Sequence, residues 1–262
     1  MKSAAKLTRM SGAGNTFFIT DSETCRPESR PAFVHKLCND YVGFATDGVL
    51  FLQNSNSADA DWDFYNSDGS HAEMCGNAAR CAGLYFFAKI KSKKEVSFGT
   101  AAGPILTQII DANKGIVRVR MPEIEKNFGP KEILVNKRKV RGFLVNTGVP
   151  HFVLQQGPDQ QLAQELRQSK DLGEKGANIT FAEFDSGDFI QAVTFERGVE
   201  NFTLACGTGA VAAAKFHRAC HPSATVQTVE MPGGLLQVEW QGDVALLTGP
   251  AEFHFDLQLY ED

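Results

Sequence analysis

The chain contains Met74-Cys75-Gly76-Asn77-Ala78-Ala79-Arg80-Cys81-Ala82 and, much later, Ala205-Cys206-Gly207-Thr208-Gly209-Ala210-Val211-Ala212-Ala213. In both stretches a cysteine and a glycine stand immediately before a run of small, mostly apolar residues. Apolar residues of the first run recur at the spacing of one helical face, and the second run is apolar nearly all round, which is typical of a helix packed on every side. The sequence therefore predicts two buried helices, each beginning just after a cysteine.

A thiol at the start of a helix lies where unpaired backbone N–H groups and the helix dipole favour negative charge, so we expect a lowered thiol pKa there. One such site would indicate a nucleophile, whereas two in separate halves of the chain indicate a paired function. The alternative is that Cys75 and Cys206 are small buried hydrophobic residues, as cysteine often is. We expect that plainer role for the other four cysteines, which are Cys25, Cys38, Cys81 and Cys220.

Composition excludes several classes of protein. The 262 residues carry a net charge of −5 and contain no lysine–arginine block that could bind a phosphate backbone, so a nucleic-acid partner is not expected. No window is long and apolar enough for a signal peptide or a membrane span, so no membrane partner is expected. The six cysteines include no CxxC pair, which argues against a zinc or thioredoxin-like site and favours a reducing cytoplasm.

The segments around the two helices repeat in the same order. Each half has a strand, a glycine turn and a strand, then a loop and a strand, then a strand before the cysteine helix, and finally a hairpin. The first half adds a short helix over 31–41. The matching pairs are 11–18 with 145–153, 43–52 with 176–181, 63–68 with 193–198, and 102–121 with 233–247.

This duplication predicts an α+β fold of two pseudo-symmetric lobes, each a strand-rich, barrel-like sheet wrapped around a central helix. We expect an N-terminal lobe over 1–122, completed by a C-terminal strand over 252–262, and a C-terminal lobe over 123–251. A pseudo-twofold axis would bring both helix starts to one cleft, where we expect the active site. The alternative is a duplication that stabilises the fold and carries no chemistry.

Two facing thiols suit the inversion of a tetrahedral carbon by proton transfer, which needs a base on one face and an acid on the other. The carbanion that forms at an amino acid α-carbon needs strong stabilisation. Backbone N–H groups at the two helix starts can hold the substrate carboxylate and stabilise this added charge. These groups belong to Gly76, Asn77, Gly207 and Thr208.

Further polar residues stand near the expected cleft. Glu196 and His151 could tune the cysteines by hydrogen bonding, one to each thiol. The alternatives are an exposed ion pair between Glu196 and Arg197, and a loop histidine with only structural bonds. Asn15, Asn66 and Asn178 lie in loops on the same side, although asparagine in a turn commonly serves the backbone.

At these residues the sequence resembles the diaminopimelate epimerase family over nearly its whole length. Seven blocks carry the resemblance in family order: 11–17, 46–48, 66–81, 146–151, 178–181, 196–198 and 203–210. It implies an amino acid epimerase that interconverts LL- and meso-diaminopimelate, for lysine and peptidoglycan biosynthesis. It also implies a PLP-independent enzyme with no cofactor and no metal, and a cytoplasmic homodimer whose lobes close over the ligand.

The resemblance also implies a role for each site residue. Cys75 and Cys206 would be the acid and base, with His151 and Glu196 tuning them. The reacting carboxylate would bind Gly76, Asn77, Gly207 and Thr208. The rest of the substrate would be held by Asn15, Asn66, Asn178, Glu196 and Arg197.

Three positions depart from the family pattern. Val149 stands where many members have an asparagine that helps to bind the distal amino acid centre, Thr16 where aspartate is usual, and Phe202 where glutamate is common. None affects the thiols or the carboxylate site. Val149 bears on substrate choice, so the alternative is a related two-cysteine racemase or epimerase that acts on another amino acid such as proline. A second alternative belongs to a different functional class. It is a thiol-based redox or ligand-binding protein in which Cys75 and Cys206 form a regulatory disulfide.

Overall fold

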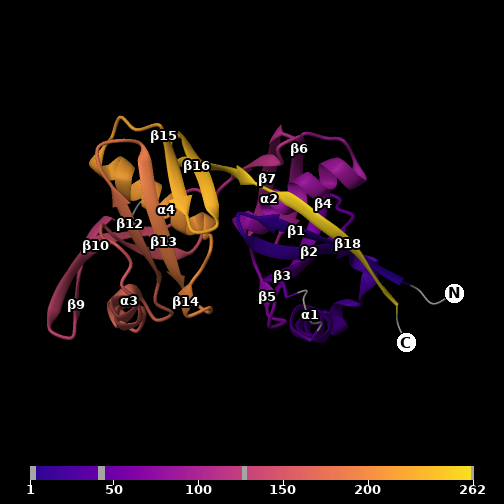
Figure 1. Ribbon diagram of the computed structural model, residues 1–262, viewed down its shortest axis with the longest axis horizontal. Coiled ribbons are helices and arrows are strands. Elements are labelled where there is room, and N and C mark those ends of the chain that lie inside the picture. Colours follow the sequence, from indigo (N-terminus) through magenta and orange to yellow (C-terminus); the bar gives the residue numbers. More distant parts are fainter. Residues whose placement is uncertain (1–3, 41–44, 126–128, 261–262) are drawn as a thin grey trace. The chain divides into compact units, whose positions relative to one another are not determined.

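Two compact units make up the chain in the computed structural model (Figure 1): Met1–Val119 with Gly249–Asp262, and Arg120–Thr248. The structure describes residues 4–40, 45–125 and 129–260. Tyr41 at the predicted helix end, the first two loop residues Gly43 and Phe44, and the last two residues of the predicted C-terminal strand lie outside these ranges. Each unit is described by itself below.

The first unit is one mixed sheet with two main helices. The paired strands follow the order β18–β1–β2–β3–β4–β6–β7, with β2–β3 and β4–β6 parallel and the other pairs antiparallel. Its elements are β1 (Ala4–Gly12), β2 (Asn15–Asp21), η1 (Ser22–Thr24), η2 (Pro27–Ser29), α1 (Arg30–Asn39), β3 (Gly48–Gln53), β4 (Ala60–Asn66), β5 (His71–Ala72), α2 (Gly76–Tyr85), η3 (Phe86–Ile90), β6 (Glu95–Thr100), β7 (Gly103–Asp111), β8 (Ile116–Arg120) and β18 (Glu252–Tyr260).

The second unit repeats this scheme. Its strands follow the order β9–β10–β11–β12–β13–β15–β16–β17, with β11–β12 and β13–β15 parallel and the rest antiparallel. Its elements are β9 (Gly129–Val135), β10 (Arg138–Asn146), β11 (Pro150–Leu154), α3 (Gln160–Arg167), η4 (Lys170–Leu172), β12 (Asn178–Phe184), β13 (Phe189–Glu196), β14 (Asn201–Phe202), α4 (Gly207–Cys220), β15 (Val226–Met231), β16 (Gly234–Gln241) and β17 (Val244–Pro250).

The matching pairing schemes confirm the duplication and the predicted α+β class of two repeated lobes. In each unit a parallel pair follows the glycine-turn hairpin, and a second parallel pair crosses over the cysteine helix. Helix α2 packs against β1, β2 and β7, and α4 packs against β10 to β13, β15 and β16. Each sheet therefore encloses its own helix.

Small residues allow these helices to lie deep inside the sheets. Every residue of α2 except Tyr85 is buried. A Cβ atom at Gly12 of β1 would come within 2.7 Å of the Asn77 carbonyl oxygen in α2, so strand and helix approach too closely for a side chain there. Within the described ranges, no helix has the length and apolar composition needed to cross a membrane.

The six cysteines differ in burial. Cys38 and Cys81 are buried, as predicted. The prediction was wrong for Cys220, which is exposed because it is the last residue of α4, beyond the part of that helix that the sheet encloses. Cys25 is half-buried in the turn after η1.

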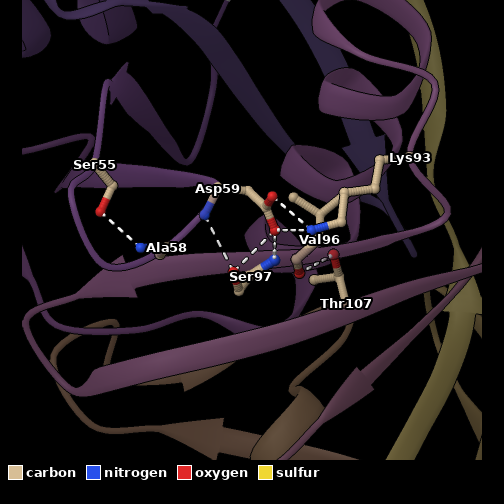
Figure 2. Close-up of polar contacts among 7 residues, drawn as sticks. All are labelled: Ser55, Ala58, Asp59, Lys93, Val96, Ser97 and Thr107. Carbon is tan, nitrogen blue, oxygen red and sulfur yellow. Dashed lines mark hydrogen bonds and ion pairs between the residues drawn. The ribbon is translucent and has the colours of Figure 1, made fainter.

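An ion pair between Asp59, just before β4, and Lys93, just before β6, lies beside the start of β6 (Figure 2). The carboxylate of Asp59 accepts hydrogen bonds from Lys93 Nζ at 2.6 and 2.7 Å and from the backbone N–H and hydroxyl of Ser97, both at 2.9 Å. Desolvation alone would raise the pKa of Asp59, but these hydrogen bonds lower it. One strand further in, the buried hydroxyl of Thr107 donates to the Val96 carbonyl at 3.1 Å.

Candidate active site

Cys75 lies at the N-cap position of α2 and is half-buried. Its backbone is extended (φ −144°, ψ 122°), and its side chain does not cap the helix. The N–H groups of the first helical turn have no partners within the helix, which makes such a terminus suitable for binding an anion. The prediction that α2 begins just after Cys75 is confirmed.

Asn77 is held from both sides by polar groups of the first unit. Its Nδ2 donates to Asn15 Oδ1 at 2.6 Å, and its Oδ1 accepts from Arg80 Nη2 at 2.8 Å. Arg80 is fully buried, and its Nε donates to the Pro250 carbonyl at 3.1 Å. The structure thus brings together two predicted site residues, Asn15 and Asn77, and adds Arg80. The sequence feature that could have identified Arg80 is its charge, which stands out within a run of small and apolar residues.

Asn66 is the last residue of β4, immediately before a turn. Its Nδ2 donates to the Ser70 hydroxyl at 3.0 Å, so here the asparagine serves its own turn. Asp47 connects this turn to the start of β2, where Asn15 is the first residue. The Asp47 carboxylate accepts from the Thr16 backbone N–H at 2.7 Å, and the Asp47 carbonyl accepts from the Ser67 N–H at 3.0 Å.

Cys206 occupies the equivalent N-cap position of α4, with an extended backbone (φ −118°, ψ 106°). It is buried, with only 6% of its surface exposed. Burial raises the pKa of the Cys206 thiol well above its ordinary value, and the negative charge of Glu196 raises it further. A hydrogen bond that the Thr208 hydroxyl or the Gly209 backbone N–H donates to the sulfur lowers the pKa, but these bonds do not offset the two raising effects.

The prediction of a lowered pKa at this helix start is therefore wrong for Cys206. The helix dipole stabilises a negative charge in the first turn only modestly. The free-energy cost of removing a thiolate from water is larger, so burial determines the direction of the pKa shift. Burial and the charge of Glu196 therefore favour the thiol form of Cys206. Its Sγ lies 3.3 Å from the Thr208 hydroxyl.

His151 on β11 is completely buried. Its Nδ1 lies 2.9 Å from the Thr180 hydroxyl, and its Nε2 lies 2.9 Å from the Thr208 hydroxyl. Burial lowers the pKa of His151 to about 3, with a further contribution from the positive charge of Arg197, so the ring is neutral. His151 reaches Cys206 through Thr208, which differs from the direct bond to a thiol that we expected.

Glu196 stands at the end of β13, half-buried and close enough to Cys206 to influence its pKa. Its Oε1 accepts from the Thr203 hydroxyl at 2.5 Å. The backbone N–H of Arg197 donates to Asn178 Oδ1 at 2.8 Å, and its Nη1 donates to the Gly176 carbonyl at 3.4 Å. Glu196, Arg197, Asn178 and Cys206 thus gather at one end of the second sheet.

We expect Glu196→Gln to lower the pKa of Cys206, because it removes the nearby negative charge while the burial remains. A lower pKa means more thiolate at a fixed pH. Alkylation of Cys206 by iodoacetamide, measured against pH in a Cys75→Ala background, should become several-fold faster at neutral pH. Glu183→Gln, at an exposed position of the neighbouring strand β12, is the matched control and should leave the profile unchanged.

Two of the three departures from the family pattern have structural partners. The Thr16 backbone N–H and hydroxyl both donate to Asp47, the second at 3.3 Å. Phe202 packs edge-on against Phe181 and Phe195, with ring centroids 5.9 and 5.6 Å away, which anchors the loop before Thr203. Val149 lies half-buried in the turn before His151.

The sequence interpretation missed a set of threonines in the second unit. Thr147, Thr180 and Thr194 are completely buried. The Thr147 hydroxyl donates to the Thr208 carbonyl at 3.0 Å and so holds the first turn of α4. Side chains alternate between the two faces of a strand, so Thr180 lies on the same face of β12 as Asn178 two residues earlier. This alternation is the sequence feature that could have identified Thr180 as a neighbour of the site.

The sequence of this chain is similar to those of known proteins over nearly its whole length. The sequence profile described as diaminopimelate epimerase matches residues 7–126 and 143–254. The chain belongs to the diaminopimelate epimerase family. It is 37% identical to the diaminopimelate epimerase of Archaeoglobus fulgidus, over 95% of this chain and 94% of that protein. It is 33% identical to that of Aquifex aeolicus, over 97% of each.

Solved structures that resemble this member of the diaminopimelate epimerase family share its fold at low identity. A hydroxyproline epimerase from Agrobacterium vitis, with bound trans-4-hydroxy-L-proline, has a TM-score of 0.72 and 16% identity, covering 100% of this chain and 92% of that one. A PhzF-family phenazine biosynthesis protein from Bacillus anthracis has a TM-score of 0.73 and 12% identity, covering 99% and 100%. These likenesses support the two-lobed α+β architecture.

Proposed function

We propose that this chain is an amino acid epimerase that interconverts LL- and meso-diaminopimelate by moving one proton at an α-carbon. Its membership of the diaminopimelate epimerase family supports this function. The observation that carries the proposal is the repeated N-cap cysteine: each unit places a cysteine, followed by glycine, at the start of the helix that its sheet encloses.

The proposed mechanism uses one cysteine from each of the two units, which correspond in this proposal to the two lobes. One thiolate removes the α-proton from one face of the substrate, and the other cysteine delivers its thiol proton to the opposite face. The roles exchange when the reaction runs in reverse. Backbone N–H groups of Gly76 and Asn77 in α2, and of Gly207 and Thr208 in α4, bind the reacting carboxylate and stabilise the charge that develops on it.

The remaining site residues bind the rest of the substrate. Asn15 is supported in this role by its bond to Asn77, and Asn178 by its bond to the backbone of Arg197. Arg197 offers a positive charge for the distal carboxylate, and Glu196 and Asn66 offer acceptors for the distal ammonium group. Glu196 also influences Cys206, and His151 positions Thr208, so these two residues tune the acid–base pair.

The setting of the activity follows from the resemblance of the site blocks to the family. In our proposal the enzyme acts without PLP, other cofactor or metal, as a cytoplasmic homodimer in lysine and peptidoglycan biosynthesis. The two thiols then supply the proton transfers alone. Size-exclusion chromatography with light scattering tests the dimer directly.

The activity is tested in heavy water. We expect purified protein given LL-diaminopimelate to form the meso isomer and to introduce deuterium at one α-carbon, as followed by mass spectrometry and NMR, because the proton returned to the substrate comes from a thiol that exchanges with solvent. L-Proline is the matched substrate for the alternative racemase and should gain no deuterium. Deuterium in proline and none in diaminopimelate would reject the proposed substrate and keep the two-cysteine chemistry.

A further inference from the structure

A chain of buried side-chain hydrogen bonds links Cys206 to the interior of the second sheet. From the thiol it passes through the Thr208 hydroxyl to His151, then through the Thr180 hydroxyl to that of Thr194, with steps of 3.3, 2.9, 2.9 and 3.1 Å. The side chains of His151, Thr180 and Thr194 are completely buried. A buried network of this kind strongly favours one set of hydrogen-bond directions, because a reversed donor leaves a polar group unpaired.

Asn178 fixes the direction of this chain at His151. The backbone N–H of Arg197 can only donate, so the Asn178 oxygen accepts it at 2.8 Å and the Asn178 amide nitrogen must lie on the other side. That nitrogen is 3.3 Å from His151 Nε2. An amide NH₂ group can only donate, so Nε2 is the unprotonated nitrogen that accepts.

The remaining directions then follow one from another. A neutral histidine carries one ring proton, which must be on Nδ1, and Nδ1 donates it to the Thr180 hydroxyl. The Thr180 hydroxyl hydrogen is then directed to Thr194. On the other side, the Thr208 hydroxyl donates to Nε2 and so turns its hydrogen away from Cys206 Sγ, which loses a donor that would stabilise a thiolate.

We propose that Thr180 is a positioning residue that fixes the Nδ1-protonated tautomer of His151 and, through His151 and Thr208, holds the proton on Cys206. The Thr180 hydroxyl accepts the hydrogen bond from His151 Nδ1, so the protonated nitrogen is not left unpaired inside the sheet. This inference rests on the proposed function for the significance of Cys206, but the hydrogen-bond directions do not depend on the substrate. Glu196, also near the thiol, acts in the same sense because its negative charge disfavours the thiolate.

Loss of the Thr180 hydroxyl should reverse the direction of the hydrogen bonds between His151, Thr208 and Cys206. With no acceptor at Nδ1, a proton there would be buried and unpaired, which costs more than losing the long 3.3 Å contact from the Asn178 amide, so the proton favours Nε2 and is donated to the Thr208 oxygen. The Thr208 hydroxyl hydrogen then turns toward Cys206 Sγ, where it stabilises a thiolate. Thr180→Val removes the hydroxyl while keeping the shape of the side chain, and Thr180→Ser restores it.

The test uses the full chain without substrate. Long-range ¹H–¹⁵N spectra report which ring nitrogen of His151 is protonated, with the resonance assigned by its loss in His151→Asn. We expect Nδ1 protonated in the unaltered chain and in Thr180→Ser, and a shift toward Nε2 in Thr180→Val. In a Cys75→Ala background, Thr180→Val should also raise the rate of Cys206 alkylation at neutral pH several-fold.

Thr107→Val is the matched control, since it removes a buried hydroxyl bonded to a backbone carbonyl in the first unit (Figure 2). It should change neither readout. A protonated Nε2 in the unaltered chain would overturn the proposal even if Thr180→Val does not fold, and so would unchanged spectra and alkylation in a folded Thr180→Val. Failure of the heavy-water assay with the expected tautomer would reject the proposed function alone.

Discussion

Replacing either Cys75 or Cys206 with alanine is expected to lower the rate of epimerisation of LL-diaminopimelate by about 10⁴-fold. Inversion needs a proton acceptor on one face and a proton donor on the other, and one thiol cannot supply both. The rate of meso isomer formation, followed by chromatographic separation of the two isomers, measures this loss. Both single variants should lose activity to a similar extent, because each removes an obligatory step.

Partial reactions distinguish a lost proton transfer from a lost fold. Elimination of halide from a β-halogenated substrate analogue needs only proton removal, so serine at one cysteine position should retain some elimination while epimerisation ends. Cys220→Ala is the control, because Cys220 is exposed at the end of α4 and should not affect either reaction. Near-normal epimerisation in Cys75→Ala or Cys206→Ala would contradict the two-thiol mechanism.

The second large effect is expected from Gly12→Ala in β1. The added Cβ would lie 2.7 Å from the Asn77 carbonyl oxygen and 3.2 Å from Cys81 Sγ. Neither neighbour can yield easily, because the first is backbone of α2 and the second is completely buried. We expect the free energy of unfolding to fall by about 1–3 kcal/mol. Epimerisation should fall as well, because relief of the clash moves α2 and its Cys75.

Urea unfolding followed by circular dichroism measures this change. Gly129→Ala, at the start of β9, is the matched control, since no heavy atom lies within 4 Å of its added Cβ. It should alter the free energy of unfolding by less than about 0.5 kcal/mol. Equal unfolding midpoints for the two variants would show that β1 and α2 are not packed as closely as described.

The sequence predicted the organisation of the fold well because that organisation depends on local patterns. Spacing of apolar residues and the cysteine–glycine pairs located α2 and α4, and the repeated order of segments predicted two equivalent sheets. These signals lie within a few residues of one another. They do not require knowledge of which strands become neighbours.

The chemical environment of the site was harder to predict because it depends on contacts between distant segments. The pKa of Cys206 reflects burial and Glu196, ten residues earlier, and these outweigh the helix dipole. The surroundings of His151 come from β12 and α4, which only the folded sheet brings together. Arg80 was visible in the sequence, but its burial against Pro250 depends on the return of the chain after the second unit.

The pairing of β1 with β18 has a consequence for biosynthesis. The register runs from Ala4 opposite Tyr260 to Ser11 opposite Glu252, so the earliest and latest described strands are neighbours. A ribosome releases β1 long before β18 exists, and all of residues 120–248 emerge in between. The nascent second unit can therefore mature first, while β1 keeps one edge unpaired and open to chaperones or to aggregation until β18 has been synthesised.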